Sequence, residues 1–476
     1  MSIIEESIDN RPSPENFMEF IPWACSQLQL NFIILIHKEY QQEYVSVMHQ
    51  DRKKNKSKLK VQSRLDLDSD HNKDDDSNVL KTSVAADSEV IHIRAICDHA
   101  DNLTQLKFEK NIEIPRILWK VIGLIVKYHS FLTNITIHGG MDQYTLHEIC
   151  NFLNISNITE LILDYSFIAE ANYYLLLESK NDIYHISLAG CEIEDHVLKI
   201  IASKLAHPFP ASKKLSILNL ASNKITDDGA KFLADALRSN RHLSYLNLSS
   251  NRLSDKGAAE LFSVLQEFVL TKDELMAARI RHMNFLKQKN DLITKAIQEL
   301  KAGDVGRTPR RKTVRAVGTV PKRGKLEKET SLKSFGETNA KSLINVDMFL
   351  HEKAITIAES ELGDFEDPFS SSNIVVRNSF TYCIGNNILC YLNLSYNNLT
   401  YISLKEIVDL LKYQKSVDRK PTGLANLIIE GNPLPILCDE LLQIDELIET
   451  GLATHRRVSV GKRRAAQHTP QSAKRF

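Results

Sequence analysis

The stretch from Leu215 to Leu265 contains the same pattern twice, and this duplication constrains the fold more than any other feature of the chain. The first copy reads KLSILNLASNKITDDGAKFLADAL, and the second reads HLSYLNLSSNRLSDKGAAELFSVL. Leucines, asparagines and glycines recur between the copies at an offset of about 28 residues. One copy cannot bury its own apolar face, so such units must stack on their neighbours.

Each copy changes its apolar period in the middle. Leu218 and Leu220 are two residues apart, so they point to the same side of a strand. Asn223 follows, where an amide side chain can satisfy backbone groups of the turn and of the adjacent unit. The apolar spacing of Phe232, Leu233, Ala236 and Leu237 then fits one face of a helix. Each copy is therefore predicted to be a strand, a turn and a helix.

The pattern L-x-x-L-x-L-x-x-N-x-L at a fixed period is typical of leucine-rich repeats. Weaker units begin near Leu103, Leu132, Ile158 and Ile183, and two more follow at Leu389 and Leu424. We therefore predict an α/β fold, a leucine-rich repeat solenoid (horseshoe) of about eight strand-helix units. The long spacing and the D-x-G-A pattern after both strong strands resemble the ribonuclease-inhibitor-like family of these repeats, which implies an α-helix after each strand.

Four other regions accompany the repeats. Residues 1–90 are predicted to be largely disordered, because a cationic block at 52–60 is followed by an anionic block at 66–76. Within them, Met18 to Val47 is expected to form local structure. Residues 100–265 hold repeats 1–6, and residues 385–450 hold repeats 7–8 and a capping helix. Between them we expect a long charged helix at 266–300 and a basic, mostly disordered insertion at 301–384, and residues 451–476 are expected to form a basic disordered tail.

The insertion has a predicted geometry. The repeat position at Leu243 recurs at Leu389, which is one normal period plus about 118 residues later. Because loop-closure entropy grows only with the logarithm of length, we predict that these residues loop out and that the strands at 246 and 392 are direct neighbours. On the helix at 266–300, Met276, Ile280 and Met283 share an apolar stripe that suits packing on another helix. That other helix belongs either to the solenoid of this chain or to a partner protein.

The composition and the motifs of the chain limit the classes of protein to which it can belong. The chain has 476 residues, zero formal net charge and 43% hydrophobic residues, enough for a packed core. Its seven cysteines include no CxxC pair, which favours reduced thiols in a cytoplasmic protein. The apolar runs at 32–36 and 121–126 are too short for a signal or membrane helix. No GxxxxGK[ST], GxSxG or HExxH motif is present, so we expect no enzymatic activity, no cofactor, no small-molecule substrate and no membrane partner.

The residues that flank the core leucines of each strand are predicted to face solvent on the side of the sheet away from the helices. Tyr245 and Tyr391 occupy equivalent positions on strands predicted to be neighbours. Paired aromatic residues suit a hot spot for a protein partner, although cross-strand stacking without a partner produces the same pair. Four polar residues of this face are further candidates for partner binding: Asn247, Asn393, Glu160 and Asp164.

Two basic segments place hydroxyl groups near arginines, the setting that basophilic kinases recognise. Thr313 follows the run at 310–312 and Ser459 follows that at 456–457, so both are candidate phosphorylation sites. The same runs suit binding to an acidic polymer such as tubulin, a nuclear address, or a solvated tail. They lack interleaved aromatic residues, so nucleic acid binding through base stacking is not expected.

The order of the regions also resembles a group of leucine-rich repeat proteins of cilia and flagella. The resemblance rests on the predicted disordered N-terminal region, the strong pair of repeats, a long basic insertion and a closing LNLSYNNL unit. The resemblance implies a non-catalytic scaffold that binds axonemal or cytoskeletal proteins in the cytoplasm, at a cilium or flagellum. The alternative is a GTPase-activating or regulatory leucine-rich repeat protein of cytosol or nucleus. Arg116 and Arg252 lie near predicted strands, but neither stands in the arginine motif of GTPase-activating leucine-rich repeat proteins.

Overall fold

The computed structural model describes residues 11–41, 89–109, 111–305, 334–417, 419–435 and 437–449. These residues form two compact units. The repeat unit comprises the described residues up to 266 together with those from 386 onward, and the inserted unit comprises the described residues between 267 and 385.

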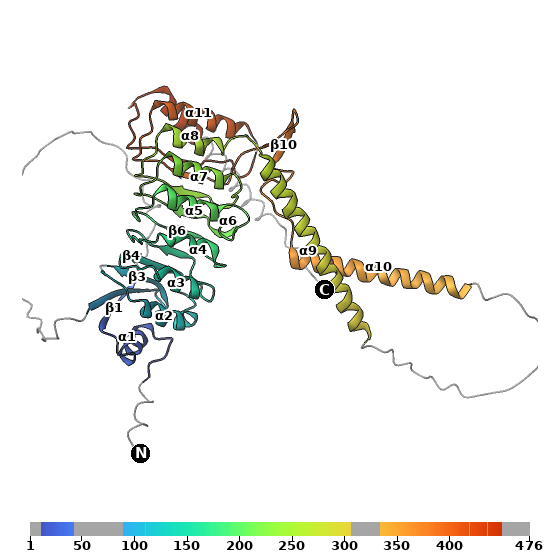
Figure 1. The fold of residues 1–476 in the computed structure, drawn as a ribbon, viewed down its shortest axis with the longest axis horizontal. Coiled ribbons are helices and arrows are strands. Elements are labelled where there is room, and N and C mark those ends of the chain that lie inside the picture. The colour runs from blue at the N-terminus through green and yellow to red at the C-terminus, as the bar shows by residue number, and fades with distance from the viewer. Residues whose placement is uncertain are drawn as a thin grey trace, which may run out of the picture. The chain divides into compact units, whose positions relative to one another are not determined.

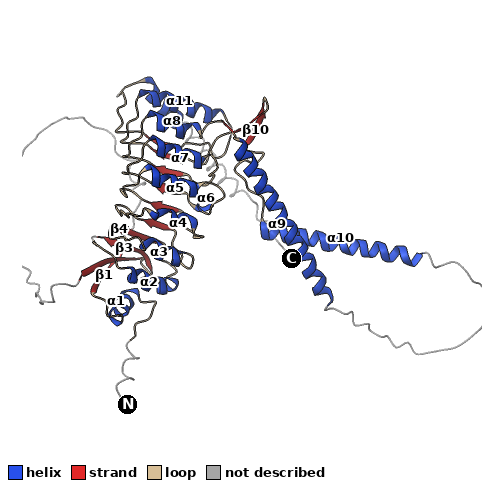
Figure 2. Ribbon diagram, in the orientation of Figure 1, coloured by secondary structure: helices blue, strands red, loops and turns tan. Residues whose placement is uncertain are grey.

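The described part of the repeat unit is built on one ten-stranded sheet, along which strands and helices alternate (Figure 1). Figure 2 shows the helices stacked along one side of the strands. Neighbouring strands are parallel except β2 and β3, which are antiparallel. Across the sheet the order is β1 (Phe32–Tyr40), β2 (Glu89–Cys97), β3 (Leu103–Glu109), β4 (Asn134–His138), β5 (Glu160–Ile162), β6 (His185–Ser187), β7 (Ile217–Asn219), β8 (Tyr245–Asn247), β12 (Tyr391–Asn393) and β13 (Asn426–Ile428).

From β3 onward the helices of the repeat unit follow the strands in the chain, and the first helix precedes β1. They are α1 (Phe17–Gln27), α2 (Arg116–Ile125), the 3-10 helix η1 (Val126–Tyr128), α3 (Thr145–Leu153), the 3-10 helix η2 (Asn172–Tyr174), α4 (Leu175–Glu178), α5 (Asp195–Leu205), α6 (Ala211–Lys214), α7 (Asp227–Leu237), α8 (Asp255–Ser263) and α11 (Tyr401–Ser416). A further helical stretch at 439–449 lies where a capping helix was expected, and its Ile444 is buried.

The middle residue of each short strand faces the helices. Leu218, Leu246 and Leu392 are fully buried and lie opposite one another in register. Burying one leucine side chain contributes roughly 2 kcal/mol, so this column of apolar residues forms the core of the repeat unit. The predicted two-residue apolar period is confirmed at these strands.

A second column, the asparagines that follow the strands, connects consecutive repeats. Asn251 Nδ2 donates to the carbonyl oxygens of Leu220 (3.0 Å) and Leu248 (3.1 Å), which belong to two different repeats. Asn397 Nδ2 makes the equivalent bonds to Leu248 (2.9 Å) and Leu394 (3.1 Å). A buried carbonyl without a partner would cost about 1–3 kcal/mol. The predicted role of the repeat asparagines is therefore confirmed.

A third column lies at the N-termini of the helices, where an aspartate of one repeat accepts hydrogen bonds from the next. Asp227 accepts from the backbone N (2.8 Å) and Oγ (2.5 Å) of Ser254. Asp255 accepts from the backbone N (2.8 Å) and Oγ1 (2.6 Å) of Thr400, and from the hydroxyl of Ser403. Each donor lies at or near the start of the following helix, where a carboxylate is also favoured by the helix dipole.

The glycine of the D-x-G-A pattern leaves room for this carboxylate. A Cβ atom on Gly257 would lie 2.4 Å from Oδ1 of Asp227 and 3.0 Å from its Cα. In the next repeat Ser403 stands at the position of this glycine, and its side chain contacts Asp255 as a hydrogen-bond donor. The position therefore serves packing between repeats, as a glycine that leaves room for the carboxylate or as a serine that donates to it.

The strands on either side of the insertion are direct neighbours. β8 and β12 pair in parallel, with Leu246 opposite Leu392. The backbone N of Asn386 donates to the carbonyl oxygen of Val264 at 2.9 Å, so the chain leaves and re-enters the repeat unit at nearly the same point. The prediction that the intervening residues loop out of a continuous sheet is confirmed.

Asn386 starts the repeat that follows the insertion. It is fully buried, its Nδ2 donates to the carbonyl oxygens of Leu237 (3.0 Å) and Asn240 (2.9 Å), and its Oδ1 accepts from the backbone N of Ile388 at 3.0 Å. One repeat earlier, Asn240 Nδ2 makes the matching bond to the carbonyl oxygen of Leu205 at 2.8 Å. The re-entering chain thus makes the same contacts as an uninterrupted repeat.

The expectation of local structure at Met18 to Val47 is confirmed for the described residues up to 41, whereas the prediction that residues 1–90 are otherwise largely disordered is wrong for residues 11–17 and 89–90. α1 buries Phe17, Phe20 and Ile21 and packs against β1 and α2. β1 and β2 extend the sheet beyond β3. These elements pack on the first repeat without carrying its leucine period, so the period could not reveal them. The charge blocks at 52–60 and 66–76 lie outside the described residues.

The inserted unit contains two long helices and a small antiparallel sheet of order β10-β11-β9. Its elements are β9 (Phe268–Val269), α9 (Lys272–Val305), α10 (Ser334–Leu362), β10 (Ile374–Arg377) and β11 (Phe380–Cys383). The charged helix predicted at 266–300 is α9, which begins later because β9 precedes it. The prediction of a mostly disordered insertion at 301–384 is wrong for residues 334–383, which include α10 and the β10–β11 hairpin. Residues 306–333 lie outside the described part of the chain, as does the tail at 451–476.

We expect the repeat unit to fold without the inserted unit, because Val264 and Asn386 are in direct contact. In a chain whose residues 267–385 are replaced by a short Gly-Ser linker, thermal unfolding followed by circular dichroism should stay cooperative. Adding Asn386→Ala to this shortened chain should lower its melting temperature, because it removes the buried hydrogen bonds to the carbonyl oxygens of Leu237 and Asn240 and from the backbone N of Ile388. Loss of cooperative unfolding in the shortened chain alone would contradict the architecture.

Replacing Asp255 should weaken the junction between the repeats that contain β8 and β12. We expect Asp255→Ala to cost about 2–3 kcal/mol at neutral pH, since hydrogen bonds to a charged group are worth that much. Burial opposes the charge of Asp255, but hydrogen bonds from Ser403 and Thr400 outweigh it and hold its pKa below the ordinary value. This contribution is therefore complete above about pH 4 and is lost as the pH falls through the depressed pKa.

Denaturant unfolding at several pH values measures this effect. The difference between the parent and Asp255→Ala should shrink at about pH 3 and below. The matched control is Asp228→Ala, because Asp228 is an aspartate on the neighbouring helix that takes no part in this junction, and it should change stability by less than about 0.5 kcal/mol. Equal losses in both variants would refute the role assigned to Asp255.

Candidate functional site

The side of the sheet away from the helices, here called the open face, carries the residues that flank the buried middle position of each strand. Strand register sorts them into two columns. The first column is Gln105, Asn134, Glu160, His185, Ile217, Tyr245, Tyr391 and Asn426, and the second is Lys107, Thr136, Ile162, Ser187, Asn219, Asn247, Asn393 and Ile428. All six residues predicted to bind a partner belong to these columns or closely follow a strand.

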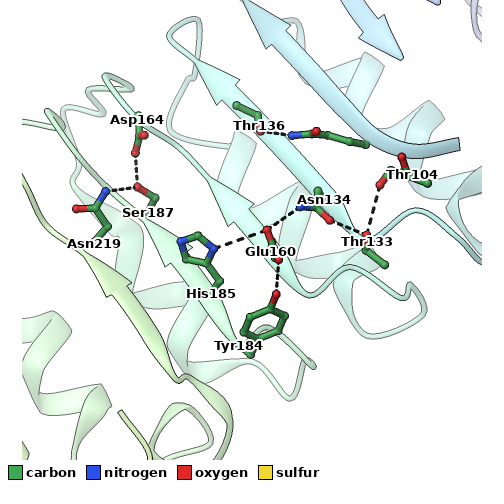
Figure 3. A network of polar contacts seen from close by, with 11 residues as sticks. Thr104, Thr133, Asn134, Thr136, Glu160, Asp164, Tyr184, His185, Ser187 and Asn219 are labelled. Carbon is green, nitrogen blue, oxygen red and sulfur yellow. Dashed lines mark hydrogen bonds and ion pairs between the residues drawn. The ribbon is translucent and has the colours of Figure 1, made fainter. Parts of the chain in front are cut away.

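Glu160 lies at the centre of a polar cluster on this face (Figure 3). Its Oε2 accepts from Asn134 Nδ2 at 2.6 Å, and its Oε1 accepts from the hydroxyl of Tyr184. His185 Nδ1 lies 3.7 Å from Oε2. The hydrogen bond to Glu160 raises the pKa of the Tyr184 phenol. The carboxylate is therefore oriented by residues of both neighbouring repeats.

Asp164, two residues after β5, is held in a similar way. Its Oδ1 accepts from Ser187 Oγ at 2.5 Å and from the backbone N of Ala189 at 3.0 Å. Ser187 Oγ in turn accepts from Asn219 Nδ2 at 2.9 Å, as Figure 3 shows. Side chains fixed in this way lose little conformational entropy when a partner binds, so these strands present a preorganised polar surface.

Tyr245 and Tyr391 form the aromatic part of the open face. Their rings stack with centroids 3.9 Å apart and planes at 9°, on the neighbouring strands β8 and β12. Burial, together with the adjacent Tyr391, raises the pKa of Tyr245 to about 12. Ile217 occupies the same column on β7 and continues the apolar surface.

Asn247 and Asn393 lie beside the tyrosines, and each has a structural role. Asn247 Oδ1 accepts from the backbone N of Ser249, and Asn393 Oδ1 from that of Ser395, both at 3.0 Å. The carboxamide oxygens therefore hold the turn that follows each strand. A partner would meet their Nδ2 groups, which have no hydrogen-bond acceptor within the described parts of the chain.

The structure brings the six predicted residues together in two groups. Glu160 and Asp164 belong to the polar cluster, the other four lie on β8 and β12, and β6 and β7 separate the groups. Sequence reasoning missed Tyr184, which directly precedes β6 and binds Glu160. The sequence shows an aromatic residue before a predicted strand. It could not show that Glu160 is its hydrogen-bond partner, because that contact depends on the strand register. The predicted phosphorylation sites Thr313 and Ser459 lie outside the described residues.

Other reactive groups on the chain have structural roles. Cys191, at an asparagine position of the repeats, has its Sγ 3.1 Å from the carbonyl oxygen of Leu163, and burial raises its pKa to about 12. It is therefore a structural thiol. Within the described ranges, no group of histidine, cysteine, aspartate or glutamate side chains is arranged to hold a metal ion. No described helix combines the length and the apolar character needed to cross a bilayer.

Arg116, considered for a GTPase-activating role, is engaged by its own neighbours. Its Nε donates to Glu148 Oε1 at 2.6 Å, and its guanidinium carbon lies 4.7 Å from the ring centroid of Tyr144. An arginine that stabilises a transition state in a partner protein has to reach that protein. The ion pair with the buried Glu148 holds Arg116 on α2 and α3 instead.

Comparison with known proteins supports the fold. A family model described as leucine-rich repeat matches residues 211–234 and 239–262. No curated protein matches the chain. Among solved structures, actin-binding site 2 of leiomodin-1 is 12% identical, covers 60% of this chain and 90% of its own, and has a TM-score of 0.29. An internalin of Listeria monocytogenes is also 12% identical, covers 74% of this chain and 69% of its own, and has the same TM-score. The repeat assignment therefore depends on the family match and the strand register.

The stacked tyrosines give a test of the site geometry. Because burial and Tyr391 raise the pKa of Tyr245, we expect Tyr391→Phe to lower this pKa slightly and Tyr391→Ala to lower it further. Nuclear magnetic resonance titration of tyrosine labelled with carbon-13 at Cζ would measure both, with Tyr245→Phe assigning the signal. Tyr128→Ala, which removes an exposed tyrosine of η1, should leave the titration unchanged. An unaltered Tyr245 pKa in Tyr391→Ala would show that the rings do not stack.

Proposed function

We propose that this chain is a non-catalytic scaffold that binds another protein on the open face of its repeat unit, with Tyr245 and Tyr391 as the principal anchors. The observation that carries the proposal is the stacking of these two rings across β8 and β12. We take the repeats to form a horseshoe of about eight units, whose concave surface is the open face. Solenoids of this kind use such extended surfaces for binding.

Two properties of the tyrosine pair favour binding. Tyrosine is enriched among residues that dominate interface energy, because it offers a large apolar area with few rotatable bonds. The rings are also fixed against one another, so little entropy is lost when a partner covers them. Ile217 on one side and the Asn247 and Asn393 amide groups beside them supply an apolar extension and hydrogen-bond donors.

The polar cluster would determine which partner binds. Glu160 and Asp164 are held by neighbouring side chains and add negative charge to β5 and its turn. A partner with cationic groups opposite these residues would be favoured, and an acidic one would be repelled. The aromatic anchors would then supply affinity and the acidic residues orientation.

We further propose that the partner is an axonemal or cytoskeletal protein and that the chain acts in a cilium or flagellum. This rests on the resemblance of its region order to leucine-rich repeat-containing protein 71. The alternative, a GTPase-activating or regulatory protein of the cytosol or nucleus, has less support because Arg116 is paired with Glu148. Loss of single-turnover GTPase acceleration in Arg116→Ala would favour that alternative.

Affinity purification of the full chain tests the scaffold role. From ciliated cells, the parent protein should recover axonemal proteins, and Tyr245→Ala combined with Tyr391→Ala should reduce their recovery by about 10-fold or more, as expected for hot-spot residues. Tyr128→Ala serves as the matched control, since Tyr128 is an exposed tyrosine in the helix layer. Recovery of only chromatin or import proteins would refute the axonemal assignment, and equal recovery by the double variant would refute the binding face.

A further inference from the structure

A stripe of apolar side chains on α9 is exposed. Met276, Ile280 and Met283 are 55%, 53% and 65% exposed. Their spacing of four and three residues places them on one face of the helix. Large apolar side chains in a continuous row mark an interaction site more often than scattered ones do.

The opposite face of α9 is already occupied within the inserted unit. Arg281 binds Asp367 through Nε and Oδ2 at 2.6 Å, and Lys289 binds Glu359 at 2.8 Å. Phe285 packs against Phe365 with ring centroids 5.1 Å apart. The helix pair also buries three small residues: Ala296, Ala354 and Ala358. Packing against α10 therefore accounts for this face and leaves the methionine stripe unexplained.

The charge pattern of α9 indicates what would cover the stripe. Between residues 275 and 290 the helix carries cations and no carboxylate. Arg281 and Lys289 are neutralised by the acidic residues near the end of α10 and after it. Arg279 and Lys287 have no ion-pair partner among the described residues. They lie three and four residues beyond Met276 and Met283, so they adjoin the stripe.

We propose that this face of α9 binds an amphipathic helix of a partner protein, whose apolar stripe is flanked by carboxylates. An apolar stripe on a straight helix fits a second helix, and methionine adapts to varied apolar surfaces. Carboxylates on the partner would pair with Arg279 and Lys287 and speed association. A second copy of this chain fits less well, because like faces would place these cations against one another.

The test uses the full chain and a designed probe. The probe is a fluorescein-labelled helical peptide with leucines in a stripe at the same four- and three-residue spacing and glutamates on both flanks. Fluorescence anisotropy should show saturable binding of this peptide. A peptide with the same leucines but lysine flanks should bind about 10-fold or more weakly, because its cations would face Arg279 and Lys287.

Variants of α9, α10 and the open face locate the contact. Changing Met276, Ile280 and Met283 together to glutamine should weaken binding by about 10-fold or more, whereas Met348→Gln, at an exposed methionine of α10, should have no effect. Arg279→Glu with Lys287→Glu should exchange the preference, so that the lysine-flanked peptide binds more tightly. Tyr245→Ala with Tyr391→Ala should leave peptide binding unchanged, which makes this test independent of the open face.

Several results would overturn the proposal. They are absence of saturable binding by the glutamate-flanked peptide, equal binding of both peptides, or no exchange of preference in the charge-reversed variant. Sedimentation of the full chain provides another: self-association that the triple glutamine variant abolishes would assign the stripe to a second copy. Binding to vesicles of anionic phospholipid with the same loss in that variant would assign it to a membrane surface instead.

Discussion

The structure depends on side chains of one repeat that complete the hydrogen bonding of the next. Asn251 and Asn397 each bond carbonyl groups in two repeats, and Asp227 and Asp255 each bond the start of the following helix. No repeat is complete alone, so stability arises mainly at the boundaries between neighbours. A polar group at such a boundary that loses its partner costs more than the bond itself contributed, because its desolvation remains. The repeats therefore specify one register of stacking.

This register creates the surface proposed to bind a partner. The Tyr245–Tyr391 stack joins residues that are far apart in the chain, and it forms where β8 pairs with β12. Asp255 and Asn397 also link these two repeats across the insertion. The hydrogen bonds of Glu160 likewise connect residues of consecutive repeats. The same contacts that stabilise the solenoid thus orient the side chains on its open face. A partner that covers this face would therefore lose little conformational entropy in ordering these side chains.

The sequence predicted those parts of the fold in which a local pattern repeats. The strands of the two strong copies and the neighbouring positions of Leu246 and Leu392 follow from the leucine period, because that period sets which side of each strand is buried. α1, β1, β2 and α10 carry no such period. They are ordered by contacts with segments distant in sequence, such as β1 against β2. Composition suggested disorder at β2 and α10, whereas local structure was predicted at Met18 to Val47. The charge blocks between β1 and β2 and the basic stretch before α10 reinforced that error.

The candidate site likewise has features that the sequence predicted and features that only the structure shows. Alternation along a strand placed Tyr245, Tyr391 and Glu160 on the open face, since a flanking residue must point away from the core. It could not show that Tyr184 binds Glu160 or that Ser187 links Asp164 to Asn219. Those contacts depend on side-chain rotamers across three strands. The structural use of the Asn247 and Asn393 oxygens was also invisible, because it depends on the turn after each strand.

The position of the insertion also follows from the contacts between neighbouring repeats. The excursion interrupts the chain between two repeats whose contacts are made by Asp255, Asn386 and Asn397, all within the repeat unit. Closing a long loop costs only slightly more than closing a short one, so the solenoid tolerates a folded unit at this junction. The two proposed binding surfaces, the open face and the α9 stripe, lie on different units of the chain. If both proposed surfaces are occupied, one chain holds two partners at a raised effective concentration relative to each other, which is the physical advantage that a scaffold offers.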